Sequence, residues 1–210
     1  MMDQEKIIAS LLLDIHAVEL NPENPFTWAS GWKSPIYCDN RKTLSYPLVR
    51  KAIQEDFARI IRQKYPEAEV IAGVATGAIA HGLLVAEALN LPFIYIRASA
   101  KKHGLGNQVE GAWKKGQKVV VIEDLVSTGG SSLSAVEALQ AEELNVLGML
   151  AIFTYEFSVA KDNFKNAGVE LTTLSNYYKL LELAEEAKYI TAGQKAALED
   201  WRNDPGAWKQ

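Results

Sequence analysis

The stretch VVVIEDLVSTGGSS, residues 119–132, decides the fold of this chain. An apolar run rich in β-branched residues ends in two adjacent carboxylates, Glu123 and Asp124, and small residues follow. The pattern predicts a buried strand, a turn and then a helix from Ser131. Free N–H groups at the start of such a helix attract an anion such as phosphate. The two carboxylates can accept hydrogen bonds from vicinal ribose hydroxyls, so residues 123–131, the acid–glycine segment, predict a site for a ribose 5-phosphate.

An ordinary strand–turn–helix with solvated acids and capping hydroxyls is the alternative interpretation. Capping alone does not require four small residues in succession, Thr128–Ser131, after two acids. The segment is not a Walker A loop, because no lysine follows the glycines. It is not a dinucleotide-binding motif either. The nearest approach to that motif, Gly104-x-Gly106, has Val109 where the third glycine belongs.

The overall composition indicates one substantial globular domain, without a general attraction to nucleic acid. The chain has 210 residues, 48% of them hydrophobic, and a net charge of −4. The acidic balance gives no general attraction to nucleic acid, so an anion site must be locally basic. The single cysteine, Cys38, excludes an internal disulfide and suits a reducing, cytoplasmic compartment. The N-terminus shows no basic leader, and its apolar stretch is too short to span a membrane.

Strand and helix patterns alternate along most of the chain. An amphipathic helix is expected over Gln4–Leu20, and the tail from Asn176 to Trp201 reads as mostly helical. Continuous apolar strands between helices predict an α/β fold with a parallel sheet covered on both faces. The expected strands are Val70–Val74, Phe93–Ile96, Lys118–Glu123, Val146–Phe153 and Leu171–Leu174, and the expected helices are Pro47–Lys64, Ile79–Asn90, Ser131–Glu143 and Val159–Ala167.

Ligands of open α/β sheets bind at the carboxyl ends of the strands. Three segments should therefore meet there, namely Val74–Ala78, the residues from Arg97 onward, and the acid–glycine segment. The aromatic-rich stretch Phe26–Arg41 does not follow the alternation and is available to cover that edge.

A long basic loop, residues 97–111, separates two of the predicted strands. Four basic residues, Arg97, Lys101, Lys102 and His103, precede the glycines at 104 and 106. The alternative is a solvated surface hairpin, in which lysines maintain solubility and Lys102 only faces water. A long charged loop inside a domain is commonly functional, often as a lid. Cations there can stabilise a departing pyrophosphate, and closure keeps water away from an oxocarbenium-like centre.

The order of residue types in the acid–glycine segment resembles the motif that binds phosphoribosyl pyrophosphate (PRPP) in the type I phosphoribosyltransferases. The basic loop, with Arg97-x-x-x-Lys101-x-His103-Gly104, is similar to the catalytic loop of the orotate-specific branch of that family. The stretch Ser30-Gly31-x-Lys33-Ser34-Pro35-x-Tyr37 resembles the amino-terminal hood of the same branch. The resemblance covers most of residues 20–175.

The resemblance implies a single phosphoribosyltransferase domain over 1–210, with a hood over about 1–45, an α/β core over about 46–175 and a helical tail over 176–210. It implies transfer of a phosphoribosyl group from PRPP to orotate in pyrimidine biosynthesis, with Mg²⁺ arriving on the substrate, no metal ligands of the protein, and no nucleic-acid or membrane partner. It also implies a homodimer whose loop cations reach the neighbouring subunit. The implied catalytic residues are Lys101, His103 and Asp124; the PRPP-binding residues are Arg97, Lys101, His103, Glu123, Asp124, Leu125, Val126, Ser127, Thr128, Gly129, Gly130 and Ser131; the orotate-binding residues are Ser127 and Tyr37.

Some positions depart from the pattern of other family members, and their contacts are not transferred to this chain. These positions are Ala29, Thr76-Gly77 and the residues around Tyr155. Trp28 and Trp32 lie in the hood, where they either contact substrate or serve packing. His16 and His81 have no chemical partner in the sequence and are read as structural.

Two other functions remain open from the sequence. The first is a phosphoribosyltransferase for another base, since the base pocket lies in the hood, which the sequence resolves poorly. The second is a regulator that binds PRPP or a nucleotide and controls RNA without turnover. The net charge of −4 disfavours that regulator.

Overall fold

The computed structural model describes residues 3–28, 31–99 and 108–209. These residues form a six-stranded sheet in the order β10-β9-β8-β5-β6-β7. Neighbouring strands are parallel except that β7 runs antiparallel to β6. The strands are β5 (Val70–Val74), β6 (Phe93–Ile96), β7 (Val109–Glu110), β8 (Lys118–Val126), β9 (Asn145–Thr154) and β10 (Leu171–Asn176).

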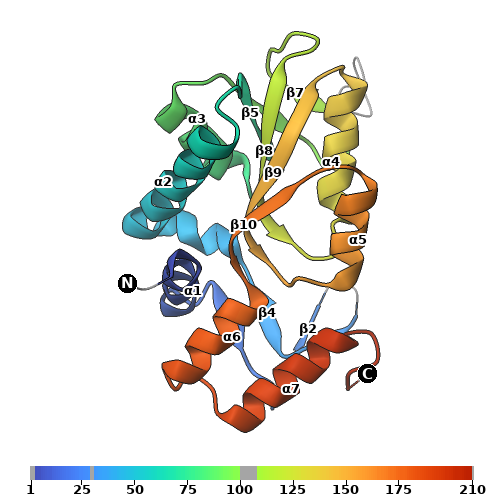
Figure 1. Cartoon of the computed structure of the whole chain (residues 1–210). Coiled ribbons are helices and arrows are strands. Elements are labelled where there is room, and N and C mark those ends of the chain that lie inside the picture. Colours follow the sequence, from blue (N-terminus) through green and yellow to red (C-terminus); the bar gives the residue numbers. More distant parts are fainter. Residues whose placement is uncertain (1–2, 29–30, 100–107, 210) are drawn as a thin grey trace.

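Helices cover both faces of this sheet, as the sequence predicts. Figure 1 shows α2 and α3 on one side and α4 and α5 on the other. Each face has its own cluster of buried apolar side chains. The helices of the core are α2 (Pro47–Lys64), α3 (Ile79–Leu89), α4 (Gly130–Ala141) and α5 (Ser158–Asn166).

Central strands carry long apolar runs because both of their faces are buried. Every residue of β5 is buried, as are the five residues of β8 from Val119 to Glu123. Such strands need no alternation of polar and apolar residues, which explains the continuous β-branched runs in the sequence. The parallel arrangement brings the carboxyl ends of β5, β6 and β8 to one edge of the sheet.

The amino-terminal hood consists of short strands beside that edge. β1 (Val18–Leu20) pairs with β4 (Ile36–Cys38), and β2 (Phe26–Thr27) pairs with β3 (Lys33–Ser34). The hood strands lie near the last two helices at the lower end of Figure 1. The remaining helices are α1 (Gln4–Asp14), the 3₁₀ helix η1 (Asn40–Ser45), α6 (Tyr177–Glu186) and α7 (Ala192–Asn203).

The predicted first helix is too long. The helix α1 ends at Asp14, and residues Val18–Leu20 of the predicted helix form the strand β1 instead. The chain turns at His16, whose φ of +54° is left-handed, and the N–H groups of residues 16 and 17 bond back to the last turn of α1. Left-handed residues at this position are usually glycine, so a histidine gives no stop signal. Val18 is apolar and falls at helical spacing, so the sequence pattern extends the predicted helix past its true end.

Smaller differences concern the ends of elements. The strand β8 continues three residues beyond its predicted end at Glu123, so Asp124 is part of the strand. The helix α4 begins at Gly130, one residue before the predicted start. Of the two histidines that the sequence predicts to be structural, His81 is buried. None of the helices in the described ranges is long and apolar enough to cross a membrane.

Candidate active site

The turn between β8 and α4 exposes backbone donors at the predicted place. Among the described residues, the N–H groups of 128–132 have no hydrogen-bond acceptor, and the first helical bond is from Leu133 N to Gly129 O. Gly129 has a φ of +84°, and a Cβ there would approach Phe164 to 3.0 Å, so the position requires glycine. The Nδ2 of Asn163 on α5 donates to Thr128 O at 3.0 Å and holds the turn from outside. Backbone N–H groups without acceptors at the start of a helix can bind a phosphate group.

The three segments predicted to meet do so at this edge. The N–H of Ala75 donates to the carbonyl of Ile96 at 2.8 Å, joining the ends of β5 and β6. The backbone of Gly77 lies against Asp124, because a Cβ on Gly77 would come within 2.1 Å of the carboxylate Oδ2. Asp124 is half-buried, so its carboxylate remains accessible beside the turn of residues 127–131, which we call the phosphate turn.

The two neighbouring acids have different environments. Glu123 is only 5% exposed. Its Oε2 accepts from Ser132 Oγ at 2.9 Å, and its Oε1 accepts from the backbone N–H of Asp124 at 3.0 Å. Burial, followed by the adjacent Asp124 charge, raises the pKa of Glu123 to about 8. Of the two predicted ribose ligands, Asp124 is the more exposed, and its carboxylate also interacts with that of Glu123.

We predict that Glu123→Gln removes a pH dependence of stability. The ordinary pKa is 4.5 and the folded one is about 8. Between these values the unfolded chain loses a proton that the folded chain keeps, so the wild type loses stability as pH rises through this window and stays level above it. The melting temperature of the variant should change less from pH 5 to pH 8, by at least ~4 °C, since ~1 kcal/mol is worth ~2–4 °C here. Parallel curves for the two proteins would contradict the assignment.

An apolar cavity of about 540 Å³ adjoins the phosphate turn. Its walls come from the hood, the end of β8 and the residue after β9. Ser127 and Tyr37, the two predicted base contacts, both line it, as does Leu125 of the predicted set. The full lining is Thr27, Trp28, Tyr37, Cys38, Leu125, Ser127 and Tyr155. We call it the base cavity. The side chain of Val126 is fully buried, so only its backbone can face a ligand.

Trp28 both packs against other aromatic rings and lines the base cavity. Its indole lies 5.3 Å from the ring of Tyr155 and 5.5 Å from that of Trp201, between ring centroids, and its Nε1 donates to Ile36 O. Trp28 is therefore a packed wall of the base cavity. Trp32 does not line this cavity. The sequence did not single out Tyr155 as a wall, because a residue after a strand acquires that role only through the neighbouring hood.

The described part of the basic loop is its stem. Arg97 and Gln108 exchange two hydrogen bonds of 2.9 Å, from Arg97 N to Gln108 O and from Gln108 Nε2 to Arg97 O. Arg97 also lies 3.6 Å from Glu110 as an ion pair. This stem begins at the end of β6, beside the segment of Gly77. The predicted cations Lys101, Lys102 and His103 lie outside the described residues, as do Ala29 and Ser30 of the hood.

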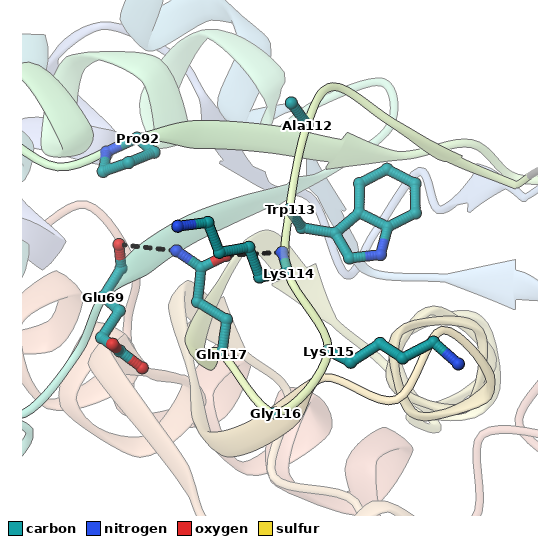
Figure 2. Close-up of a pocket in the computed structure, with 8 residues that line it drawn as sticks. All are labelled: Glu69, Pro92, Ala112, Trp113, Lys114, Lys115, Gly116 and Gln117. Carbon is teal, nitrogen blue, oxygen red and sulfur yellow. Dashed lines mark hydrogen bonds between the residues drawn. The ribbon is translucent and has the colours of Figure 1, made fainter.

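Another pocket, of about 500 Å³, lies at the opposite, amino-terminal end of the strands. Figure 2 shows Trp113 and Gln117 on opposite sides of the backbone between them, with the amide of Gln117 bonded to the carbonyl of Glu69. It is far along the sheet from the acid–glycine segment and shares no residue with the base cavity. In the described ranges, no group of three or more His, Cys, Asp or Glu residues could hold a metal ion.

Backbone amides for a phosphate, a carboxylate for ribose hydroxyls and an apolar cavity of base size meet on one edge of a parallel sheet. This fold and site define a type I phosphoribosyltransferase. Residues 44–169 match the family model described as the phosphoribosyl transferase domain. The chain is 54% identical over 208 residues to orotate phosphoribosyltransferase of Bacteroides thetaiotaomicron, covering 99% of this chain and 98% of the relative. It is 53% identical to that of Lactococcus lactis subsp. cremoris, covering 99% and 100%.

Solved structures agree with this assignment. Orotate phosphoribosyltransferase from Aeropyrum pernix has a TM-score of 0.75 and 26% identity, covering 88% of this chain and 99% of that one. UMP synthase of Leishmania donovani has a TM-score of 0.80 and 28% identity, covering 94% of this chain and 42% of that one. The chain belongs to the orotate phosphoribosyltransferase family.

Proposed function

We propose that this chain transfers the 5-phosphoribosyl group of PRPP to orotate, forming orotidine 5′-monophosphate and pyrophosphate in pyrimidine biosynthesis. The observation that carries the proposal is the junction at Ser127, which belongs both to the phosphate turn and to the base cavity. A base in the cavity and a ribose phosphate on the turn are thereby held next to each other, as bond formation between them requires.

The proposed PRPP contacts divide by chemistry. The amides of Thr128–Ser131 bind the 5-phosphate, and the carboxylate of Asp124 accepts from the ribose hydroxyls. Glu123 supports this arrangement by holding the N–H of Asp124 and the hydroxyl of Ser132. Leu125 and Val126 contribute the strand end that leads into the turn. The proposed base contacts are Ser127 and Tyr37, which both line the base cavity.

The reaction breaks the bond between the anomeric carbon and pyrophosphate, and the electron pair of that bond leaves with the pyrophosphate. The orotate ring nitrogen forms the new bond to the same carbon and gives up its proton, which the departing pyrophosphate accepts. Negative charge grows on the leaving oxygens, where Arg97, Lys101 and His103 are proposed to donate hydrogen bonds. The ion pair of Arg97 with Glu110 keeps this guanidinium at the loop stem, close to the sheet edge.

Mg²⁺ is proposed to reach the site bound to PRPP. Pyrophosphate and ribose oxygens are the hard ligands that this ion prefers, and the half-exposed Asp124 carboxylate is a compatible neighbour. When bound, the ion neutralises charge on the pyrophosphate. The residues described above position the sugar and the base.

A homodimer is proposed because large apolar side chains on and beside the adjacent helices α2 and α3 are exposed. Leu48 at the start of α2 is 84% exposed, and Leu83 on the adjacent α3 is 53% exposed; Tyr46 is exposed beside α2. Exposed apolar clusters of this kind mark protein interfaces, and most soluble oligomers pair identical subunits. In the proposed dimer, a second copy of the chain covers these residues, and the basic loop of one subunit acts at the site of the other.

The decisive experiment is an assay of purified protein with Mg²⁺, PRPP and a panel of bases. Release of pyrophosphate with orotate and not with adenine, guanine or hypoxanthine is expected. Release with a purine alone would assign a different base transferase. PRPP binding without turnover, together with retention on RNA, would assign the regulator instead.

A further inference from the structure

One backbone carbonyl at the site is held by a side chain from the hood end of the chain. The pairing of β8 with β5 stops at Ile122, opposite Gly73, although β8 continues to Val126. Beyond that point, no strand within residues 3–28, 31–99 and 108–209 pairs with this side of β8. The Nδ2 of Asn40 takes the place of the missing strand and donates to the carbonyl of Asp124 at 2.6 Å.

Asn40 is itself fixed by a buried polar chain. It is 1% exposed, and its backbone carbonyl accepts from the Oγ1 of Thr43 at 2.5 Å. That hydroxyl lies 2.9 Å from Nε2 of His81 on α3. The single hydroxyl proton is directed to Asn40, so the ring nitrogen Nε2 must supply the proton of the second bond. The ring is therefore the Nε2–H tautomer, and its buried Nδ1 has no partner in the described part of the chain.

The same residue is close in sequence to the base cavity. Asn40 follows the hood strand β4, and Tyr37 and Cys38 of that strand line the cavity. The Sγ of Cys38 lies 3.5 Å from the Asn40 Oδ1. Contacts of Cys38 with Asn40, and of Asn40 with the Asp124 carbonyl, thus connect the hood strand to the backbone that carries the Asp124 carboxylate.

We propose that Asn40 is a positioning residue that holds Asp124 for the ribose and links the hood to the PRPP site. The inference rests on the proposed function for the identity of the ligand. Without the amide, the Asp124 carbonyl loses its donor and the end of β8 can shift. The carboxylate then moves away from Gly77 and from the ribose hydroxyls.

The test is a double-mutant cycle with calorimetric titration of PRPP in the presence of Mg²⁺. Asn40→Ala is expected to weaken PRPP binding about tenfold, the effect of one lost hydrogen bond of about 1.4 kcal/mol. In the Asp124→Asn background, Asn40→Ala should add less than a twofold change, since it acts through that carboxylate. Equal effects in the two backgrounds, or unchanged binding in Asn40→Ala, would overturn the proposal.

The matched control is Gln117→Ala. This residue makes the same type of bond, from a side-chain amide to the carbonyl of Glu69, at the other end of the sheet (Figure 2). It should leave PRPP binding unchanged in both backgrounds. A control that weakens binding as much as Asn40→Ala would also overturn the proposal, because the loss would then reflect general destabilisation.

Thr43→Val keeps the shape of the side chain and tests the proposal if Asn40→Ala does not fold. It removes the hydroxyl that fixes Asn40, so about a threefold weakening of PRPP binding, again absent in the Asp124→Asn background, is expected. Additive effects would contradict the proposal. Because the readout is binding, a wild type that binds PRPP but does not consume orotate would refute the proposed reaction and leave this result interpretable.

Discussion

Replacing Gly77 with alanine is expected to weaken PRPP binding by about 10- to 100-fold while leaving the fold intact. The added Cβ would lie 2.1 Å from the Asp124 Oδ2 and 2.4 Å from its Cγ, so the carboxylate must turn away. Turning one flexible side chain costs the fold little. The ribose, however, would lose charged hydrogen bonds worth about 1.5–3 kcal/mol, which corresponds to the stated loss of affinity.

Titration calorimetry with PRPP, together with thermal melting, checks this prediction. Gly193→Ala is the matched control, because a Cβ at Gly193 meets only the Thr191 Oγ1, at 4.0 Å. The control should bind PRPP like the wild type. If Gly77→Ala kept the wild-type affinity, Asp124 would not contact the ribose. If it melted many degrees lower, the contact of Gly77 with Asp124 would be structural.

Lys101→Ala is expected to lower turnover by about 100- to 1000-fold with little change in PRPP affinity. The ammonium group is proposed to contact oxygens that gain charge only as pyrophosphate departs, so its contribution belongs to the transition state. Single-turnover rates and the dissociation constant for PRPP, measured on the same preparation, separate the two effects. Equal losses in rate and affinity would mean that Lys101 only binds the ground state.

Mixing inactive variants tests whether this lysine acts across the proposed dimer. In a random mixture of Lys101→Ala and Asp124→Asn subunits, half of the dimers contain one of each. If the loop acts on the neighbouring subunit, each mixed dimer has one intact site, and activity should return to about a quarter of the wild-type level. A loop that serves its own subunit leaves every site with one lesion, and the mixture stays inactive.

Local sequence patterns predicted most of the fold. The runs around Val70, Phe93 and Val119 are strands, and Pro47–Lys64 is a helix with the predicted bounds. These predictions succeeded because burial on both faces of a parallel sheet leaves a continuous apolar run. The helix over Gln4–Leu20 was wrong after Asp14, because the turn at His16 carries no glycine and Val18 fits a strand equally well.

The candidate site was predictable where chemistry depends on residue type within a short segment. The turn at Gly129–Gly130 needs small residues and left-handed backbone, and it exposes its amides as expected. The different environments of Glu123 and Asp124 were not predictable. Two adjacent strand residues face opposite sides, and only packing decides which side contains Ser132 and which contains Gly77.

The sequence by itself determined the α/β class and the phosphate turn, because both follow from contacts within a few residues. The tertiary structure alone decided how that turn is completed. Asn40 reaches the Asp124 carbonyl across 84 positions of sequence, and Trp28 of the hood packs on Tyr155 beyond β9. Such contacts depend on where separate elements come together in the folded chain, and short-range patterns of hydrophobicity and turn residues carry no information about that placement.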